Sequence, residues 1–375
     1  MAPPDAAPDQ ATDERELEWP RPALSSVWHR AVDDLVLVGF RRRKPHRPED
    51  QLTRVESEAT AALKLYRELG WLDDPTLAHP EPPPPTVVEV APARAGRTTY
   101  KAVTFASGYE PGVAEPAAER WNSFAANRTV HVWMLRHREP RPWVVCLHGA
   151  GMGRAIMDFG LFRAGWMHDT LGLNVAALVL PLHGPRRAEI PADAHFPSED
   201  AMHNIHGARQ AVWDARRLIA WIRTQGDEPV GVIGVSLGGY IAALLGGLAD
   251  GLRTVMLGAP VADLTALIEH HKGSALPHEK ANIALARQLG PVVSPLAFAP
   301  RVPFDGRFIY AGVVDKMVNP RHHAERIWNH WGRPEALWYQ GGHADLGWAK
   351  VIGRFIERNL DEVEMTRRRP AETPD

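Results

Sequence analysis

From residue 143 onward, short apolar runs alternate with longer segments whose apolar residues recur every three or four positions. The short runs have the length of buried strands, and the longer segments have the periodicity of amphipathic helices. The clearest helical segment is 202–224, where Ile205, Val212 and Ile219 belong to one apolar stripe. Strands that alternate with helices form a mostly parallel sheet with helices on both faces. The sequence therefore predicts an α/β fold.

Six buried strands are predicted in this part of the chain. They span 143–147, 174–180, 230–235, 253–258, 307–313 and 335–340. Shorter β-rich runs precede them at 86–90, 100–105 and 129–135. Segment 261–303 interrupts the alternation with five prolines and helical pieces, and it is too long for an ordinary connection. We expect it to form a lid-like insertion over the carboxyl end of the sheet.

The N-terminal part has a different composition. Residues 1–22 are rich in Pro, Ala and acidic residues, so we expect disorder there. A helical pattern then spans 51–69, and four consecutive prolines at 82–85 favour a stiff, extended connector. The predicted organisation is a helical extension and Pro-rich connector at 23–85, a main domain at 86–360 and a tail at 361–375.

A Gly-x-Ser-x-Gly motif at 234–238 joins the predicted strand 230–235 to an apolar helical segment. A serine at a sharp strand-to-helix turn needs small neighbours, and its hydroxyl projects beside the positive end of the helix. The same pattern also occurs at glycine-rich helix starts, where Ser236 would only cap the helix. Ser236 is therefore a candidate nucleophile that needs partners elsewhere in the chain.

A serine hydroxyl is a poor nucleophile at neutral pH and needs a base that an acid orients. Where a serine occupies such a turn, the chain order is nucleophile, acid and histidine, each after a strand. Asp315 follows the predicted strand 307–313, and His343 follows the predicted strand 335–340. Asp263, after the predicted strand 253–258, is the alternative acid. The sequence predicts a triad of Ser236, Asp315 and His343.

Acyl transfer also needs donors for the oxyanion of the tetrahedral intermediate. The segment His148-Gly149-Ala150-Gly151 follows the predicted strand 143–147, at the loop that faces the nucleophile in such sheets. We expect the backbone N–H of Leu237 to be one donor and that of Ala150 to be the other, with Gly151 as the alternative. His148 is expected to have a structural role.

These motifs together resemble the α/β-hydrolase superfamily over about residues 86–360: LHGAG at 147–151, GVSLGG at 234–239, the Asp315 loop and GGHADL at 341–346. Loop 181–187 is similar to a loop of dienelactone-hydrolase-like and prolyl-oligopeptidase-like enzymes. The chain differs from the first group by its serine nucleophile and from the second by lacking a propeller. Arg186 and Arg187 in this loop are expected to be solvated, with a contact to a substrate carboxylate as the alternative.

The resemblance implies an α/β-hydrolase fold and an esterase-like reaction. The predicted function is a metal-independent serine hydrolase that cleaves a small-molecule carboxylic ester, or a thioester or amide, through an acyl-enzyme intermediate. Two alternatives stay open. A non-catalytic protein of this fold would bind a ligand without turnover, and an acyltransferase would use the same residues with an acceptor other than water.

No cofactor or metal is predicted. The segment 149–154 lacks a dinucleotide-binding motif, because Arg154 stands where the last glycine is required. The histidine pairs at 203/206, 270/271 and 322/323 lack the carboxylate pattern of a zinc hydrolase.

Charge, hydropathy and cysteine content limit the partners and the compartment. The 43 Lys and Arg residues nearly balance 45 Asp and Glu residues, which argues against a nucleic-acid partner. No apolar run reaches the roughly 18 residues of a membrane helix. The single cysteine, Cys146, and the lack of a secretory signal in the N-terminal sequence predict a cytoplasmic protein.

Overall fold

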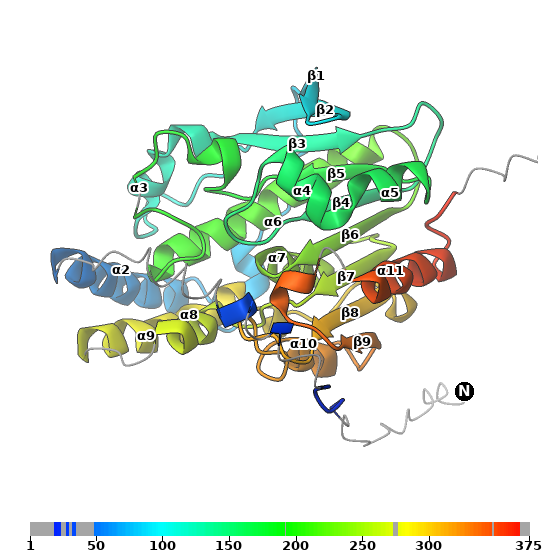
Figure 1. Cartoon of the computed structure of the whole chain (residues 1–375). Helices are drawn as coiled ribbons and strands as arrows, with labels where there is room; N and C mark the ends of the chain where they lie inside the picture. Colours follow the sequence, from blue (N-terminus) through cyan, green and yellow to red (C-terminus); the bar gives the residue numbers. More distant parts are fainter. Residues whose placement is uncertain are drawn as a thin grey trace, which may run out of the picture.

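A computed structural model of the chain describes residues 19–23, 28–29, 32–34, 49–191, 193–272, 277–346 and 349–367. At its centre lies a nine-stranded sheet with the strand order β1-β2-β3-β5-β4-β6-β7-β8-β9 (Figure 1). The strands are β1 (Glu89–Ala95), β2 (Thr98–Ala106), β3 (Thr129–Leu135), β4 (Trp143–Leu147), β5 (Asn174–Leu178), β6 (Val230–Val235), β7 (Thr254–Gly258), β8 (Arg307–Gly312) and β9 (Glu335–Tyr339). The five neighbouring pairs from β5 to β9 are parallel, whereas β1, β2 and β3 pair antiparallel. The predicted α/β fold with a mostly parallel sheet is confirmed.

The buried strands were the most predictable elements. Strands β3, β4 and β6 have the predicted bounds, and β5, β7, β8 and β9 differ from prediction by one or two residues. Every residue of β4, β5, β6 and β7 is buried, which is why these strands have continuous apolar sequences. The first strand begins at Glu89 rather than at residue 86, after the Pro-rich connector.

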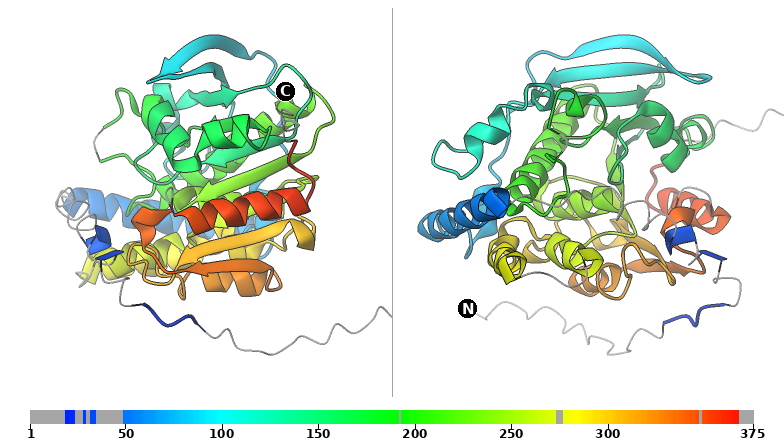
Figure 2. Two further views of the ribbon diagram at one scale, coloured as in Figure 1. Left: turned by 45° about the vertical axis from the view of Figure 1, so that its right-hand side comes forward. Right: turned by 60° about the vertical axis from the view of Figure 1, so that its left-hand side comes forward.

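Helices cover both faces of the sheet (Figure 2). One face packs against α4 (Ala155–Phe162), α5 (Ala164–Asp169) and α11 (Lys350–Glu362). The other packs against α6 (Ala201–Arg223), α7 (Leu237–Leu248) and α10 (Ala324–His330). A short helix, α3 (Ala118–Asn122), lies between β2 and β3. The loops that follow the parallel strands therefore lie together, at the end of the sheet where these strands have their carboxyl ends.

The N-terminal extension and the insertion pack against each other. Helix α2 (Glu49–Glu68) contacts α9 (Pro277–Leu289) and α6, and α9 contacts α8 (Leu264–Lys272). Buried side chains of α2 such as Tyr66 belong to the same hydrophobic core as α6 and α7. The extension is therefore an added layer on the main domain and shares its core.

Two predicted boundaries need correction. Trp19 lies inside the segment expected to be disordered, yet its ring packs 4.7 Å from that of Trp338, centroid to centroid. Residues 1–18 lie outside the described residues. At the other end, the predicted tail begins too early, because Val363 and Met365 are buried and Arg367 N–H donates to Leu171 O. Apolar side chains anchor both segments.

The predicted solvated position of Arg186 is wrong. Its side chain is fully buried and pairs with the equally buried Asp214 at 2.9 Å. Its guanidinium also donates to the backbone carbonyls of Val179 and Asn127. A buried guanidinium needs these acceptors to offset its lost hydration. Arg186 therefore ties β5 to α6 and does not face a substrate.

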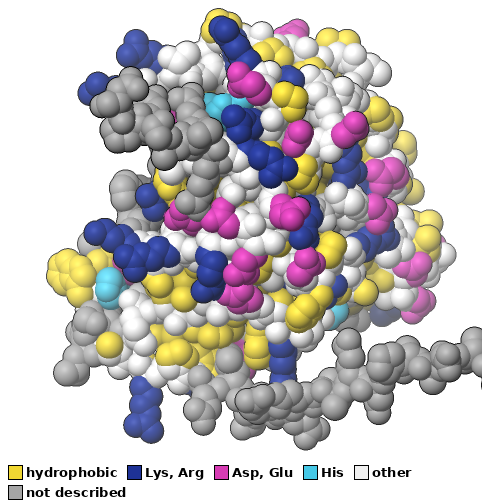
Figure 3. All heavy atoms as spheres, turned by 90° about the vertical axis from the view of Figure 1, so that its right-hand side faces the viewer, with side chains coloured by type: hydrophobic (Ala, Val, Ile, Leu, Met, Phe, Trp, Pro, Cys, Tyr) yellow, Lys and Arg dark blue, Asp and Glu magenta, His cyan; other side chains and the backbone are white. Residues whose placement is uncertain are grey.

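The charged side chains are mixed by sign on the face shown in Figure 3. Lys and Arg side chains lie among Asp and Glu side chains there, in line with the formal net charge of −2. Within the described residues, no helix is both long and apolar enough to cross a membrane.

Candidate active site

Ser236 lies in the one-residue turn between β6 and α7. Its backbone has φ 58° and ψ −115°, a conformation that costs an L-residue about 1–3 kcal/mol and is frequent at functional sites. A backbone hydrogen bond fixes the turn to the neighbouring strand: Ser236 N–H donates to Gly258 O of β7 at 2.8 Å. A Cβ atom at position 238 would lie 1.8 Å from Leu147 O of β4. Only glycine at 238 lets the start of α7 approach the sheet this closely.

The loop after β4 runs beside this serine. A Cβ atom built on Gly149 would lie 3.6 Å from Ser236 Cβ. The buried His148 holds the loop with both ring nitrogens: Nδ1 bonds to Gly149 O at 2.8 Å, and Nε2 accepts the Leu180 N–H at 3.1 Å. Burial lowers the pKa of His148 to about 4. A neutral ring with both nitrogens engaged orients the loop, which is the structural role expected for it.

The candidate oxyanion donors come from the start of α7 and from the loop after β4. Leu237 is the first residue of α7, and the N–H groups of a first helical turn have no partner within the helix. Ala150 and Gly151 are exposed in the turn after His148. Gly151 has φ 79° and nothing within 4 Å of its Cβ position.

The structure brings Asp315 and His343 into direct contact. His343 Nδ1 lies 2.7 Å from Asp315 Oδ2. The other carboxylate oxygen, Oδ1, accepts the N–H groups of Met317 at 2.9 Å and Val318 at 2.8 Å. The Asp315 side chain is fully buried, whereas that of His343 is 12% exposed. The carboxylate is therefore fixed by its own loop and orients a ring that reaches the surface.

The charge environment of His343 favours its protonated form. Burial alone lowers the pKa of this imidazole, but the charge of Asp315, the hydrogen bond to it and the charge of Asp33 raise the pKa above its ordinary value. Nδ1 faces Asp315, which leaves Nε2 as the ring nitrogen directed away from this carboxylate. Within the described part of the chain, neither Nε2 nor the Ser236 hydroxyl makes a hydrogen bond, so both stay available to a substrate. Such bonds commonly tighten only when substrate is present.

The alternative acid, Asp263, has other contacts. Its carboxylate accepts the Ala266 N–H at 2.9 Å at the start of α8 and lies 3.8 Å from Arg326. Asp263 therefore acts as a helix cap beside a cation, and the residue that contacts His343 is Asp315.

Asp33 is a site residue that carries no sequence motif. It is fully buried, and its carboxylate accepts backbone N–H groups of Lys316, His343 and Ala344 at 3.0–3.3 Å. In Figures 1 and 2 the short blue segments of the N-terminal extension lie beside the orange turn that carries His343. The only hint in the sequence is that Asp33 and Asp34 follow Trp28 in a short helical pattern, which is equally typical of a surface helix.

A cavity of about 340 Å³ lies under the insertion. Tyr240, one turn of α7 beyond Ser236, lines it together with Ala262 and Asp263 after β7. Further lining comes from α6, α9 and the segment 290–297 of the insertion. Cavities of this size accommodate small organic molecules.

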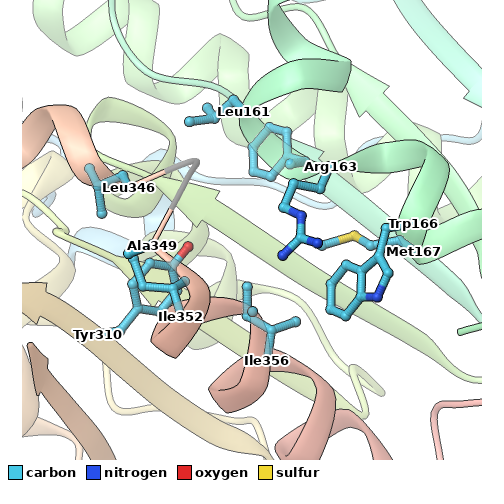
Figure 4. Close-up of a pocket in the computed structure, with 11 residues that line it drawn as sticks. Leu161, Arg163, Trp166, Met167, Tyr310, Leu346, Ala349, Ile352 and Ile356 are labelled. Atoms are coloured by element: carbon cyan, nitrogen blue, oxygen red, sulfur yellow. The ribbon is translucent and has the colours of Figure 1, made fainter. Parts of the chain in front are cut away.

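A second pocket lies on the opposite face, between α5 and α11. Figure 4 shows Arg163 and Trp166 facing Ile352 and Ile356 across it. The Arg163 guanidinium stacks on the Trp166 ring at 4.7 Å. The volume is about 20 Å³, which is room for about one water molecule. This pocket is too small for an ester substrate.

The histidine pairs are separately engaged. His206 contacts Tyr109 Oη and Pro116 O, and His271 Nε2 bonds to Met317 O. His323 Nδ1 accepts the Ala262 N–H. In the described ranges, no group of three His, Cys, Asp or Glu side chains is arranged to hold a metal ion.

The comparisons with known proteins include two mycobacterial sequences and several solved structures. No protein-family model matches the chain. It is 43% and 42% identical over 346 residues to the uncharacterized proteins MT2702 and Rv2627c from two strains of Mycobacterium tuberculosis, covering 91% of this chain and 83% of each relative. These identities show that the three chains share one family.

Two solved structures have the same fold at low sequence identity. Acetyl xylan esterase 1 from Thermoanaerobacterium sp. JW/SL YS485 aligns with a TM-score of 0.53 and 14% identity, over 86% of this chain and 99% of that chain. The acetyl xylan esterase from Paenibacillus sp. R4 aligns with a TM-score of 0.51 and 14% identity, over 86% and 100%. Together with the sheet order, these alignments show that the chain has the α/β-hydrolase fold, and the chain belongs to one family with the two mycobacterial proteins.

Proposed function

We propose that this protein is a serine hydrolase that cleaves a carboxylic ester through an acyl-enzyme intermediate. The observation that carries the proposal is the 2.7 Å contact between His343 Nδ1 and the buried Asp315 carboxylate, at the sheet edge where Ser236 has φ 58°. A strained serine and an oriented imidazole at the same edge are the requirements of nucleophilic acyl transfer.

In the acylation step, Ser236 Oγ attacks the ester carbonyl carbon while His343 Nε2 accepts the hydroxyl proton. Asp315 keeps the Nδ1–H tautomer and stabilises the imidazolium that forms. The backbone N–H groups of Leu237 and Ala150, with Gly151 as the alternative to Ala150, donate to the oxyanion. The intermediate collapses when the C–O bond to the alcohol breaks and His343 returns the proton to the leaving oxygen.

In the deacylation step, His343 Nε2 accepts a proton from water, and the resulting hydroxide attacks the acyl carbonyl. Collapse of the second tetrahedral intermediate breaks the bond to Ser236 Oγ, which takes the proton back from His343. The products are the carboxylic acid and free enzyme. No metal or cofactor is needed for any of these steps.

The candidate substrate pocket is the cavity under the insertion, whose lining includes Tyr240 of α7 but none of Ser236, Asp315 and His343. At about 340 Å³, it has room for a short acyl chain or a compact alcohol. The two aligned enzymes are named as acetyl xylan esterases, so acetyl esters are a sensible first substrate class. Thioesters and amides need the same residues and belong in the same panel.

Turnover of a substrate panel tests this proposal. Wild type, Ser236→Ala and the matched control Ser123→Ala are assayed with short-chain nitrophenyl esters, acetylated sugars, thioesters and anilides. Ser123 is an exposed residue whose hydroxyl bonds to Arg120 O, so its loss removes a serine far from the turn. We expect ester hydrolysis by wild type and Ser123→Ala and none by Ser236→Ala. Folded wild type that hydrolyses no substrate class, or Ser236→Ala with full activity, would refute the proposal.

Product analysis separates hydrolysis from acyl transfer. The same ester is incubated with a competing alcohol, and the acid and the new ester are quantified. We expect acid as the main product. A dominant new ester at low alcohol concentration would identify the acceptor as an alcohol rather than water.

A further inference from the structure

The segment around Asp33 joins the two loops that carry Asp315 and His343. Asp33 Oδ2 accepts the N–H of Lys316, the residue that follows Asp315, at 3.1 Å. The same carboxylate accepts the N–H of His343 at 3.0 Å and that of Ala344 at 3.3 Å. One buried side chain therefore bonds to the backbone of both loops.

Two neighbouring contacts hold this segment in place. His29 Nδ1 lies 2.8 Å from Asp345 Oδ2, and the same oxygen accepts the Gly342 N–H at 2.7 Å. Asp34 Oδ2 pairs with Lys316 Nζ at 2.6 Å on the surface. Contacts at residues 29, 33 and 34 thus all fall on the two loops.

The fit around Asp33 is tight and specific for a carboxylate. A Cβ atom on Gly342 would lie 2.7 Å from Asp33 Oδ2, so the carboxylate sits directly against the turn before His343. A carboxylate presents only acceptors, and backbone N–H groups are its natural partners. An amide at position 33 would offer one acceptor oxygen and would turn its NH₂ toward N–H groups.

We propose that Asp33 is a positioning residue of the hydrolase site, which locks the Asp315 and His343 loops together and places a second carboxylate behind the His343 turn. The proposal rests on the function proposed above. Asp33 does not touch the reacting atoms, and it acts through the backbone of the loops and through its charge. The N-terminal extension thereby becomes a part of the active site.

The charged and titratable groups that face His343 come from four places in the chain. Asp315 follows β8, and Asp33 comes from the N-terminal extension. Asp345 lies in the turn of His343 itself, and Tyr339 at the end of β9 donates from its hydroxyl to Gly342 O at 3.0 Å. Lys316, a cation in the Asp315 loop, pairs with Asp34 on the surface. The balance is negative, and Asp33 is among the groups that raise the pKa of His343.

The test compares Asp33→Asn with the matched control Asp34→Asn. Both variants remove one carboxylate from adjacent positions, but Asp34 is 54% exposed and contacts only the Lys316 ammonium among the described side chains. Steady-state kinetics are measured from pH 5 to pH 9 on the best ester, with rates expressed per active site after titration by a fluorophosphonate. We expect Asp33→Asn to lower kcat by about 10- to 100-fold with little change in KM, since small displacements of reacting groups cost this much.

The fall in activity at low pH, the acid limb of the pH profile, distinguishes a positioning role of Asp33 from a role in folding alone. The base must be neutral to act, so activity falls as pH drops through the pKa of His343. Because removal of the Asp33 charge lowers this pKa, the acid limb of Asp33→Asn moves to lower pH. The limb of Asp34→Asn moves much less, because Asp34 and its partner Lys316 are exposed and their charges are screened by solvent. A variant that was only partly folded would show fewer active sites with an unchanged kcat per site and an unchanged limb.

The outcomes are distinct. Unchanged kcat per site and an unchanged acid limb in Asp33→Asn overturn this inference while leaving the proposed function intact. Wild type that neither turns over an ester nor reacts with the fluorophosphonate overturns the proposed function itself. If Asp33→Asn does not fold, Asp33→Ser is used, because its hydroxyl fits the space and accepts a backbone N–H; the same two readouts apply to it.

Discussion

The serine half and the histidine half of the candidate site are held in different ways. Ser236 is fixed by the centre of the sheet: its N–H bonds to Gly258 O of β7, and Gly238 packs against Leu147 O of β4. Asp315 and His343 lie on the loops after β8 and β9, the last two strands in the order of the sheet. Those loops are joined by Asp33, a residue 310 positions before His343.

This difference predicts which substitutions change the stability of the protein and which change the reaction rate. A turn whose geometry depends on buried strands changes only when the core changes. Loops at a sheet edge have fewer neighbours and depend on specific polar contacts. We therefore expect core substitutions to affect the serine half through stability, and polar substitutions to affect the histidine half through rate.

The largest effect is expected from removal of the base. His343→Ala should lower kcat by about 10⁶-fold, as the loss of one member of such a triad does. His322→Ala is the matched control, because His322 is exposed in the turn before α10. Rates of ester hydrolysis by both variants are compared with wild type. Similar rates for the two variants would show that His343 is not the base.

Replacement of the acid is expected to have the next largest effect. Asp315→Asn should lower kcat by about 10⁴-fold, because the amide no longer holds the correct tautomer of His343. Asp263→Asn, at the alternative acid, should lower the rate far less, since Asp263 caps α8 and lines the cavity but does not contact His343. A larger loss in Asp263→Asn than in Asp315→Asn would reverse the assignment.

The serine half should respond through stability. Gly238→Ala places a Cβ atom 1.8 Å from Leu147 O, and such overpacking costs at least about 1–3 kcal/mol of unfolding free energy. Gly290→Ala serves as the control, because nothing lies within 4 Å of its Cβ position. Urea denaturation monitored by tryptophan fluorescence measures both. Equal stability of the two variants would mean that the α7 start is less constrained than its contacts indicate.

The smallest effect concerns the pH at which wild type loses activity, compared with the pH expected for an ordinary histidine. Because the pKa of His343 is raised above the ordinary 6.5, the acid limb of kcat/KM should have its midpoint above pH 6.5. Activity should fall as pH drops through that value, where His343 becomes protonated. In Asp315→Asn the same limb should move to lower pH. A wild-type midpoint below 6.5 would contradict the charge environment described for His343.

Much of the sheet and of the serine half could be predicted from sequence. The buried strands have continuous apolar runs, and a glycine-flanked serine after such a run carries its own local signal. Asp315 and His343 were also chosen as candidates from the sequence, because each directly follows a predicted strand, and the structure places them in contact. These features depend on short segments of chain, so a local pattern is enough to find them.

The features that the sequence did not predict depend on contacts between residues that are far apart in the chain. Arg186 was expected in solvent, because nothing near it in sequence shows that Asp214 on α6 is its buried partner. Asp33 was not identified, because an aspartate in an N-terminal segment is ordinarily a surface residue. The ends of the fold were likewise misplaced, since Trp19 and Met365 find their apolar partners far along the chain.

Covalent labelling of Ser236 tests the central claim most directly. The intact protein is treated with a fluorophosphonate, and the modified residue is identified by mass spectrometry of its peptides. We predict one adduct, on Ser236, formed more slowly in Asp33→Asn than in Asp34→Asn and absent from Ser236→Ala. Folded wild type that stays unlabelled, or an adduct that persists in Ser236→Ala, would contradict the account.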